Sequence, residues 1–561
     1  MTATNARTGA QILVDQLTIQ GVEHVFCVPG ESYLAVLDAF CDAKIEITVC
    51  RQETGAGIMA DASARLTGRP GVVFVTRGPG ATNAAHAIHI AEHDSIPLVM
   101  FIGQVERGML GRGAFQEMDF ESFFGSTAKW VTEIHDPARL PEVVARAFHV
   151  AMQGRPGPVV ISLPEDMLVE TANAADAARV EPAHIHPGLG EMARLRDMLA
   201  KAKRPIAILG GSDWSADACR SFRDFAEKFD LPVVTSFRRT MLFDGEHANY
   251  CGELSLGANP ALVKRIAEAD FVLLIGGRMA EVPSQAYTLF DIPMPRQTLV
   301  HVHADAKELG RVYQAALAIN ATPQAFCDVL RMLEDLKEIV WRGETKAARE
   351  AYLAFTNLDA QIPGDVQLNE IMLWLRKRLP ADAIVTNGAG NYAIWVGRYL
   401  RIRQFGGLLA PVSGSMGYGL PAAVGAKRVR PDRMVVSFAG DGCFLMNGQE
   451  FATAVQYNLA IVVVVIDNGM YGTIRMHQER EYPGRVSATL LNSPDFAALA
   501  RGFGGHGETV VKTEEFAPAF ERAVASDKPA IVHVKIDREA ITPATTLTAI
   551  RQAALKRAAT N

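Results

Sequence analysis

Two short polar segments at the ends of apolar runs could together bind a metal ion and a phosphate. Gly-Asp-Gly at 440–442 follows RMVVSFA, and Asp-Asn-Gly at 467–469 follows AIVVVVI. The helical pattern between them predicts a strand–helix–strand unit, with both polar segments at one edge of a parallel sheet. Carboxylate and amide oxygens suit Mg²⁺, and glycines let backbone N–H groups approach phosphate oxygens. We therefore predict a metal–diphosphate site containing Asp441 and Asn468, against the alternative that both are ordinary turn residues.

The composition is that of an ordinary globular enzyme. The 561 residues are 49% apolar and 21% charged, and this length predicts two to four domains. The net charge of −6, with scattered Lys and Arg, argues against a nucleic-acid partner. Seven cysteines without a Cys-x-x-Cys pair, and an N-terminus without an apolar signal stretch, predict a reduced, cytoplasmic protein. The longest apolar runs are too short to span a bilayer, so no membrane partner is expected.

Short apolar strands alternate with helix-length segments along the whole chain. This alternation predicts an α/β fold of three doubly wound parallel-sheet domains, at 1–170, 191–340 and 362–561. The Ala-rich segment 171–190 contains Pro and Gly without clean periodicity, and we interpret it as a linker. Ligands of such sheets bind at the carboxyl ends of the strands, where the two polar segments stand.

Several further motifs stand in one order along the chain, and with them the chain resembles the thiamine diphosphate enzymes of the acetolactate synthase-like branch. They are RQETGAG at 51–57, TRGPGATN at 76–83, AFQE at 114–117 and GSMGYGLPAAVGAK at 414–427. The resemblance covers nearly the whole chain. It implies an N-terminal pyrimidine-binding domain, a central domain and a C-terminal diphosphate-binding domain. A Walker-type Gly-x-x-x-x-Gly-Lys is absent from the sequence, which disfavours a nucleotide triphosphatase.

The resemblance implies roles for three residues around the cofactor's organic part. Glu53 would stand beside the aminopyrimidine ring and favour the tautomer that activates the thiazolium carbon. Met416 would support the bent cofactor, and the carbonyl of Gly414 would accept a hydrogen bond from its amino group. For a lone methionine, the alternative is plain core packing.

The resemblance also implies the contacts of the diphosphate. Asp441, Asn468 and the main-chain oxygen of Met470 would bind Mg²⁺, with two diphosphate oxygens and one water completing an octahedron. The other expected cofactor contacts are Gly390, Asn391, Tyr392, Gly440, Gly442, Cys443 and Tyr471. Because members of this family build each site from two subunits, the resemblance implies a homodimer or a dimer of dimers.

Two segments depart from the acetolactate synthase pattern. Thr473 and His477 replace a Met and a Trp, so His477 would offer a hydrogen bond or a proton to the substrate, or be an ordinary exposed helix residue. Glu31 replaces a glycine in the first loop, where it would lie over the reactive carbon and could release an aldehyde by donating a proton. Gln116, in the well-matched AFQE, is expected to contact the substrate.

These features predict a thiamine diphosphate- and Mg²⁺-dependent carboligase, which decarboxylates a 2-oxo acid and transfers the activated aldehyde to an acceptor. The alternatives are a non-oxidative 2-oxo acid decarboxylase, a related C–C bond lyase, a flavin-dependent oxidase and a non-catalytic cofactor-binding protein. The segments GELSLGANP and GGRMAEVP replace most flavin contacts of the relatives and keep Arg278, so FAD is disfavoured. The C-terminal tail is expected to form a surface helix, with a lid over the active-site mouth as the alternative.

Overall fold

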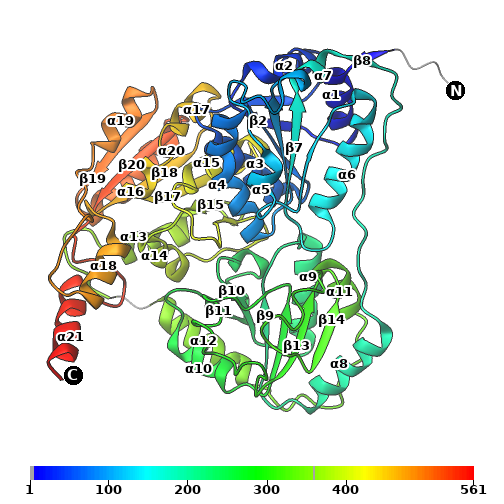
Figure 1. The fold of residues 1–561 in the computed structure, drawn as a ribbon. Coiled ribbons are helices and arrows are strands. Elements are labelled where there is room, and N and C mark those ends of the chain that lie inside the picture. The colour runs from blue at the N-terminus through cyan, green and yellow to red at the C-terminus, as the bar shows by residue number, and fades with distance from the viewer. Residues whose placement is uncertain (1–5, 358–359, 561) are drawn as a thin grey trace. The chain divides into compact units, whose positions relative to one another are not determined.

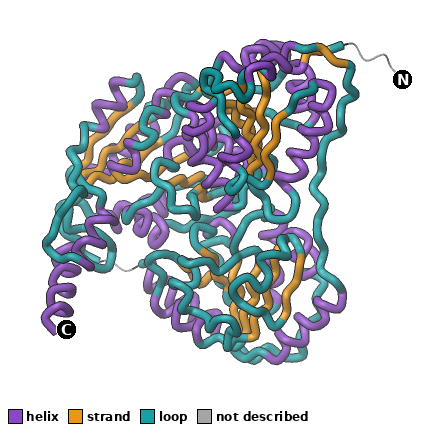
Figure 2. The backbone as a smooth tube through the Cα atoms, viewed as in Figure 1, coloured by secondary structure: helices purple, strands orange, loops and turns teal. Residues whose placement is uncertain are grey.

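The structure is a computed structural model that describes residues 6–357 and 360–560. Within these residues there are three six-stranded sheets, and every strand pair in them is parallel. Figure 1 and Figure 2 show strands of each sheet side by side, with helices around them. The predicted α/β fold of three doubly wound parallel-sheet domains is confirmed.

The first sheet is formed by the N-terminal part of the chain. Its strands are β2 (His24–Cys27), β3 (Glu46–Val49), β4 (Gly71–Val75), β5 (Leu98–Gln104), β6 (Trp130–Glu133) and β7 (Pro158–Pro164), in the spatial order β3-β2-β4-β5-β7-β6. Its helices are α1 (Gly9–Ile19), α2 (Leu34–Ala39), α3 (Glu53–Thr67), α4 (Gly78–Asp94), α5 (Phe120–Phe124), α6 (Leu140–Met152) and α7 (Glu165–Val169). The central strands β4 and β5 are buried at every residue, as apolar runs covered on both faces must be. A short antiparallel pair joins β1 (Arg7–Thr8) to β8 (Thr171–Ala172).

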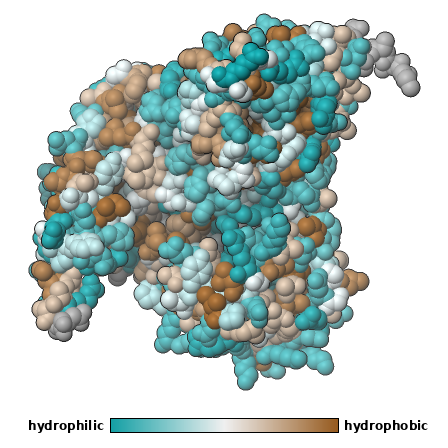
Figure 3. Space-filling model, in the orientation of Figure 1, coloured by the Kyte–Doolittle hydropathy of each residue, from teal (hydrophilic) through white to brown (hydrophobic). Residues whose placement is uncertain are grey.

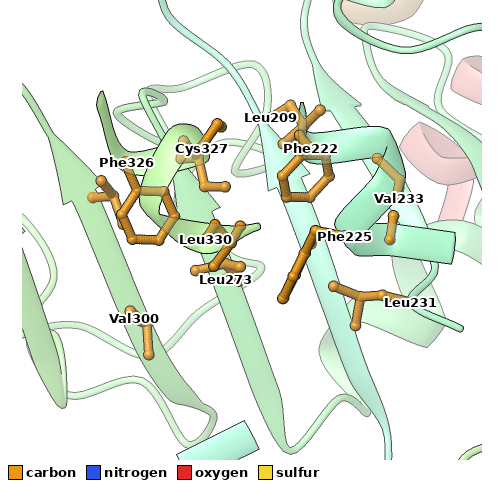
Figure 4. Close-up of a cluster of buried hydrophobic side chains, with 14 of the residues drawn as sticks. Leu209, Phe222, Phe225, Leu231, Val233, Leu273, Val300, Phe326, Cys327 and Leu330 are labelled. Carbon is orange, nitrogen blue, oxygen red and sulfur yellow. The ribbon is translucent and has the colours of Figure 1, made fainter. Parts of the chain in front are cut away.

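The second sheet belongs to the central domain. Its strands are β9 (Pro205–Leu209), β10 (Val233–Ser236), β11 (Tyr250–Leu254), β12 (Phe271–Ile275), β13 (Thr298–His303) and β14 (Leu317–Asn320), in the order β11-β10-β9-β12-β13-β14. Its helices are α8 (Leu189–Lys201), α9 (Ala216–Lys228), α10 (Pro260–Ala267) and α11 (Pro323–Leu330), and α12 (Glu344–Thr356) follows them. In Figure 4, Phe222 and Phe225 of α9 and Phe326 of α11 lie over side chains of the sheet. Each buried phenyl ring contributes roughly 1.5–3 kcal/mol by leaving water.

The third sheet is formed by the C-terminal part of the chain. Its strands are β15 (Ile384–Asn387), β16 (Leu408–Leu409), β17 (Val435–Gly440), β18 (Val462–Asp467), β19 (His506–Val510) and β20 (Ala530–Lys535), in the order β16-β15-β17-β18-β20-β19. The helices of this part of the sequence are α13 (Leu368–Arg378), α14 (Tyr392–Tyr399), α15 (Gly419–Val429), α16 (Asp441–Leu445), α17 (Glu450–Gln456), α18 (Gly472–Glu481), α19 (Phe496–Gly502), α20 (Thr513–Ala525) and α21 (Leu547–Thr560). The strands β17 and β18 are neighbours, as the strand–helix–strand pattern predicts.

The chain divides into two compact units. The first contains the chain up to Ala183 together with 421–431 and 449–457, and the second contains 184–420, 432–448 and the chain from Asn458. The helix α17 and most of α15 therefore belong to the N-terminal unit, although both stand in the C-terminal part of the sequence. On the face drawn in Figure 3, hydrophobic residues are interspersed among hydrophilic ones. No helix of the described residues has both the length and the apolarity to cross a bilayer.

Candidate active site

The two predicted metal ligands lie at the carboxyl ends of neighbouring strands. Gly440 at the end of β17 pairs with Ile466 near the end of β18. Asp441 follows as the first residue of α16 and is only 3% exposed, while Asn468 follows directly after β18. The parallel pairing therefore brings a carboxylate and an amide to the same sheet edge, because β17 and β18 both end there.

A second carboxylate, Asp467, lies beside Asp441. The hydroxyl of Ser493 is within hydrogen-bond distance of both, at 3.1 Å from Asp441 and 2.8 Å from Asp467. Burial raises the pKa of Asp441 to about 6, and the negative charge of Asp467 adds to this shift. Burial alone would raise the pKa of Asp467 too, but hydrogen bonds from His533, the Gly469 N–H and Ser493 lower it to about 2. Two buried neighbouring carboxylic groups fit a divalent cation, whose charge would relieve their repulsion.

The loop that carries the third predicted ligand is held by a short antiparallel contact. Met470 pairs with Leu490, the N–H of Leu491 donates to the carbonyl of Gly469 at 2.9 Å, and the N–H of Tyr471 donates to Thr489 at 2.9 Å. Met470 itself is buried. The loop after β18 is thus positioned by main-chain hydrogen bonds on both sides of Met470.

A cavity of about 240 Å³ opens at this edge of the third sheet. All the predicted contacts of the diphosphate and of the bent cofactor line it, namely Gly390, Asn391, Tyr392, Gly414, Met416, Gly440, Asp441, Gly442, Cys443, Asn468, Met470 and Tyr471. These residues come from four separate stretches of the chain. The structure therefore brings the predicted diphosphate half of the site together in one place.

Two glycines of the lining are required by the local geometry. A Cβ atom at Gly442 would lie 2.7 Å from the ring of Tyr471, closer than real Cβ contacts allow. Gly414 has φ of +71°, in the left-handed region that side chains disfavour. Both positions keep the backbone close to the cavity, which fits a phosphate-bearing ligand.

Cys443 connects two of the loops that line the cavity. Its Sγ accepts the N–H of Gly417 at 3.2 Å and lies 3.4 Å from the hydroxyl of Tyr392. Tyr392 is buried, and burial raises its pKa well above the usual value. The thiol therefore fastens the Met416 loop to the start of α14.

The cavity lining carries a polar pair, of which Thr473 lies in the segment that differs from the acetolactate synthase pattern. The hydroxyl of Thr473 donates to Oδ1 of Asn391, and the amide nitrogen of Asn391 lies 3.5 Å from Sδ of Met476. Thr473 lines the cavity together with its neighbour Ile474. His477, on the same helix, is exposed and is not among the lining residues.

Glu53 occupies a buried position at a helix start in the first unit. It is the first residue of α3, and its Oε2 accepts a hydrogen bond from Nδ2 of Asn83 at 2.9 Å. Asn83 lies on α4 and is the last residue of the TRGPGATN motif. Gln52 caps α3 by accepting the N–H of Gly55. The positive end of the α3 dipole favours a carboxylate there.

The other two predicted residues of the first unit have different surroundings. The side chain of Glu31 is 66% exposed and forms an ion pair with Arg77 at 3.0 Å. Arg77 also forms an ion pair with Glu165 at 2.6 Å. Gln116 has φ of +64°, and its carbonyl accepts the N–H of Gly78 at 3.0 Å. The hydrogen bond joins the AFQE and TRGPGATN loops. The predicted site residues thus form two groups, one in each compact unit.

Sequence reasoning missed several residues of the cavity and its surroundings. Ser493 and His533 come from segments without a recognisable motif, and their role follows only from contacts with Asp441 and Asp467. The lining also includes Ala389, Trp395, Ile466, Gly472, Ile536, Ala540 and Ile541. The apolar residues after β20 gave no signal beyond ordinary hydrophobicity.

The glycines of the central domain are used for contact between two loops. Gly210 and Gly211 follow β9, and Gly276 and Gly277 follow β12. A Cβ on Gly211 would collide with the carbonyl of Gly276, and the indole N–H of Trp214 donates to Gly210 at 2.8 Å. These strand ends flank the point where the strand order reverses, which is the usual ligand crevice of such a sheet.

Comparisons with known proteins agree with this organisation. Residues 7–123, 192–331 and 388–534 match the N-terminal TPP binding, central and C-terminal TPP binding domains of the thiamine pyrophosphate enzymes, respectively. The isozyme 2 large subunit of acetolactate synthase from Escherichia coli (strain K12) is 32% identical, over 94% of this chain and 95% of its own. The large subunit from Parasynechococcus marenigrum (strain WH8102) is 35% identical, over 95% and 88%. The isozyme 1 large subunit from Escherichia coli (strain K12) is 33% identical, over 96% of both. The chain therefore belongs to the thiamine pyrophosphate (thiamine diphosphate) enzyme family and is an enzyme of its acetolactate synthase-like type.

Proposed function

We propose that the protein is a Mg²⁺-dependent carboligase, which decarboxylates a 2-oxo acid and transfers the activated aldehyde to an acceptor. The observation that carries this proposal is the cavity in which Asp441, Asn468 and Met470 meet Gly414 and Met416. Relatives named acetolactate synthase, similar over more than nine-tenths of the chain, support a ligation reaction.

Each half of the site has a defined task in this proposal. When bound, thiamine diphosphate supplies a nucleophilic carbon and an electron sink for decarboxylation. Asp441, Asn468 and the carbonyl of Met470 would hold Mg²⁺ against the diphosphate. Glu53, held by Asn83, would keep a proton at the pyrimidine nitrogen. The side chain of Met416 would keep the ligand bent and exclude water.

The proposal includes a homodimer or a dimer of dimers in which the Glu53 half of one subunit serves the diphosphate half of another. The resemblance to enzymes that share sites between subunits supports this arrangement. Light scattering of the purified protein, with and without thiamine diphosphate and Mg²⁺, measures the mass directly. A cytoplasmic location belongs to the same proposal, and the seven cysteines, all within the described residues, are free thiols as that location requires.

A competing function is a decarboxylase that releases a free aldehyde. Glu31 favours it, because its carboxyl group is exposed and would be the proton donor for aldehyde release. The ion pair with Arg77 limits the movement of the Glu31 side chain towards a substrate. This contact therefore favours the carboligase. Glu31→Gln separates the two functions, since a decarboxylase would lose aldehyde formation and a carboligase would keep its ligation product.

The central domain is proposed to work without FAD. The support is the direct contact of its two glycine loops at the strand ends, with Trp214 bonded to Gly210. Titration of the purified protein with FAD, followed by flavin fluorescence, tests this point. Saturable quenching would contradict it.

The first test of the function is CO₂ release from a panel of 2-oxo acids, with thiamine diphosphate and Mg²⁺, and with identification of the products. A 2-hydroxy-3-oxo acid or a hydroxyketone is the expected product. Free aldehyde as the main product would establish the competing decarboxylase instead. Cofactor binding without CO₂ release from any acid would refute both.

A further inference from the structure

Glu450 is a completely buried carboxylate in the first unit, to which neither the motifs nor the comparisons assign a role. It is the first residue of α17 and is 0% exposed. Its Oε1 accepts two main-chain N–H groups, from Arg51 at 3.1 Å and from Gln52 at 3.0 Å. Its Oε2 accepts the hydroxyl of Thr453 at 2.6 Å. Both oxygens are therefore fully engaged, and the partners of Oε1 are the two residues immediately before Glu53.

A buried carboxylate is costly unless its charge is compensated. Burial raises the pKa of Glu450, while the hydrogen bonds from Thr453, Arg51 and Gln52 act in the opposite direction. Main-chain N–H groups at the start of α3 carry partial positive charge and make charge-assisted hydrogen bonds to a carboxylate. The arrangement thus uses one carboxyl oxygen to hold the backbone that enters α3, and two directional hydrogen bonds fix this backbone as an apolar contact would not.

Two further contacts hold the same stretch of backbone. The N–H of Val49 donates to the hydroxyl of Tyr457 at 2.8 Å, and the guanidinium of Arg51 donates to Gln456 at 2.5 Å. Both acceptors belong to 449–457, the segment that carries Glu450. The stretch between the end of β3 and the start of α3 is therefore held at several points, all on the approach to Glu53.

Gly55 on α3 leaves space for the carboxyl group of Glu450. A Cβ atom at this position would lie 2.5 Å from Oε1 of Glu450 and 2.8 Å from its Cδ. Gly55 has no positive φ, so a glycine is not required there for backbone conformation. The absence of a side chain at residue 55 makes the room into which the carboxylate of Glu450 reaches.

We propose that Glu450 is a positioning residue for Glu53. By binding the N–H groups of Arg51 and Gln52, it sets the direction in which the chain enters α3 and so the place of the Glu53 carboxylate. The inference rests on the proposed function, in which Glu53 activates the cofactor. A displacement of about 1 Å of a catalytic group costs on the order of 100-fold in rate.

The test compares three variants with a matched control. Glu450→Ala removes the acceptor, Gly55→Ala displaces it without changing any charge, and Glu450→Gln keeps an oxygen that accepts the same N–H groups. The control is Gln16→Ala, because Gln16 is equally buried in the same unit and exchanges two hydrogen bonds with the backbone of Ala177 in the linker. Gln16→Ala therefore measures how far a loss of stability alone changes the rate.

The main readout is exchange of the thiazolium proton for deuterium, followed by NMR with thiamine diphosphate and Mg²⁺ and without substrate. We expect Glu450→Ala and Gly55→Ala to slow this exchange and kcat by about 100-fold, with cofactor affinity and KM nearly unchanged. Glu450→Gln and Gln16→Ala should stay close to the wild type. In the protein without cofactor, the amides of Arg51 and Gln52 should lose protection against hydrogen exchange in Glu450→Ala and Gly55→Ala, and keep it in Glu450→Gln and Gln16→Ala.

Three results would overturn the proposal, and they differ from one another. Wild-type exchange of the thiazolium proton in Glu450→Ala and Gly55→Ala would show that the turn is not needed to place Glu53. Slowing in proportion to lost thermal stability, with Gln16→Ala included, would show a purely structural role. A wild-type protein that binds the cofactor without accelerating exchange would refute the proposed function, and the role of Glu450 with it. If Glu450→Ala does not fold, Gly55→Ala and Glu450→Gln carry the comparison.

Discussion

The hydroxyl of Thr473 lies 2.8 Å from Oδ1 of Asn391 and donates a hydrogen bond to it. Both residues line the cavity, one at the start of α18 and the other just before α14. Thr473 is also one of the residues that the sequence comparison with the acetolactate synthase pattern singled out. The pair therefore fixes the orientation of the Asn391 amide in the cavity lining.

Removal of this hydrogen bond should alter substrate use. In Thr473→Val the side-chain shape is kept and the donor is lost, so Asn391 is free to turn. We expect a loss of about 1 kcal/mol, or roughly fivefold in kcat/KM for the preferred 2-oxo acid. The CO₂ assay measures it, with Thr473→Ser as the control that keeps the hydroxyl. Equal kcat/KM in Thr473→Val and wild type would mean that the hydrogen bond between Thr473 and Asn391 does not contribute to catalysis.

Binding of thiamine diphosphate should require a divalent cation that Asp441 coordinates. Chelation of Mg²⁺, or Asp441→Ala, should weaken thiamine diphosphate binding on the order of 100-fold, since the charged ligand of the metal is lost. Ser493→Ala removes only the hydroxyl between the two carboxylates and should weaken binding by about tenfold. Calorimetric titration with and without Mg²⁺ distinguishes the cases. Metal-independent binding in the wild type would contradict the predicted ligand set.

Arg238 should support the cofactor cavity from the central domain. Its guanidinium donates to the carbonyls of Gly388 at 2.8 Å and Pro411 at 2.5 Å, shortly before Gly390 and Gly414. We expect Arg238→Ala to weaken cofactor binding by about tenfold, because hydrogen bonds from a charged donor to both loops are lost. Calorimetric titration measures this.

The matched control for Arg238 is Arg349, another buried arginine. It donates to the carbonyls of Gly245 and Tyr250, which lie in the central domain itself. Arg349→Ala should lower the thermal midpoint while leaving cofactor affinity unchanged. A similar loss of affinity in both variants would show that general destabilisation, rather than the two loops, explains the Arg238 effect.

The attachment of the C-terminal helix α21 should be lost in acid. Arg551 of α21 donates two hydrogen bonds to the buried Glu479 of α18, both at 2.7 Å. The hydrogen bonds from Arg551, opposed by burial and aided by the Gly484 N–H and Arg475, lower the pKa of Glu479 to about 2. The folded carboxyl group thus binds a proton less readily than the unfolded one. The stabilisation is present above pH 4.5 and is lost as the pH falls from 4.5 towards 2.

We expect the contact between Arg551 and Glu479 to contribute about 2 kcal/mol to the free energy that holds α21 in place at neutral pH. This value allows for the solvent around the partly exposed Arg551. Hydrogen exchange of α21, compared at pH 7 and at pH 3, measures it. Glu479→Gln should already show the rapid exchange at pH 7. The control is Glu521→Gln, which breaks an ion pair with Arg378 between exposed side chains and should leave α21 unchanged. Slow exchange of α21 in Glu479→Gln would refute the attachment.

The sequence by itself determined the strands and the polar residues at their ends. Apolar runs such as VVVV in β18 leave few alternatives to a buried parallel strand, and the right-handed crossover then places Asp441 and Asn468 at one edge. The other predicted residues of the diphosphate half were named from the family resemblance, and they lie at the end of β17 or in the segments that follow β15, β16, β17 and β18. Local patterns suffice for Asp441 and Asn468 because the ends of neighbouring parallel strands lie at one edge of the sheet.

Only the tertiary structure decided which distant segments meet. Glu450 is separated from Arg51 by 399 residues, and no periodicity links them. The same holds for Ser493 beside Asp441, and for Thr473 beside Asn391. His477 shows the converse, since the packing of α18 against α21 leaves it exposed and outside the cavity lining. Contacts between segments far apart in sequence depend on how whole elements pack, and that packing is the sum of many weak side-chain contacts that no single motif records.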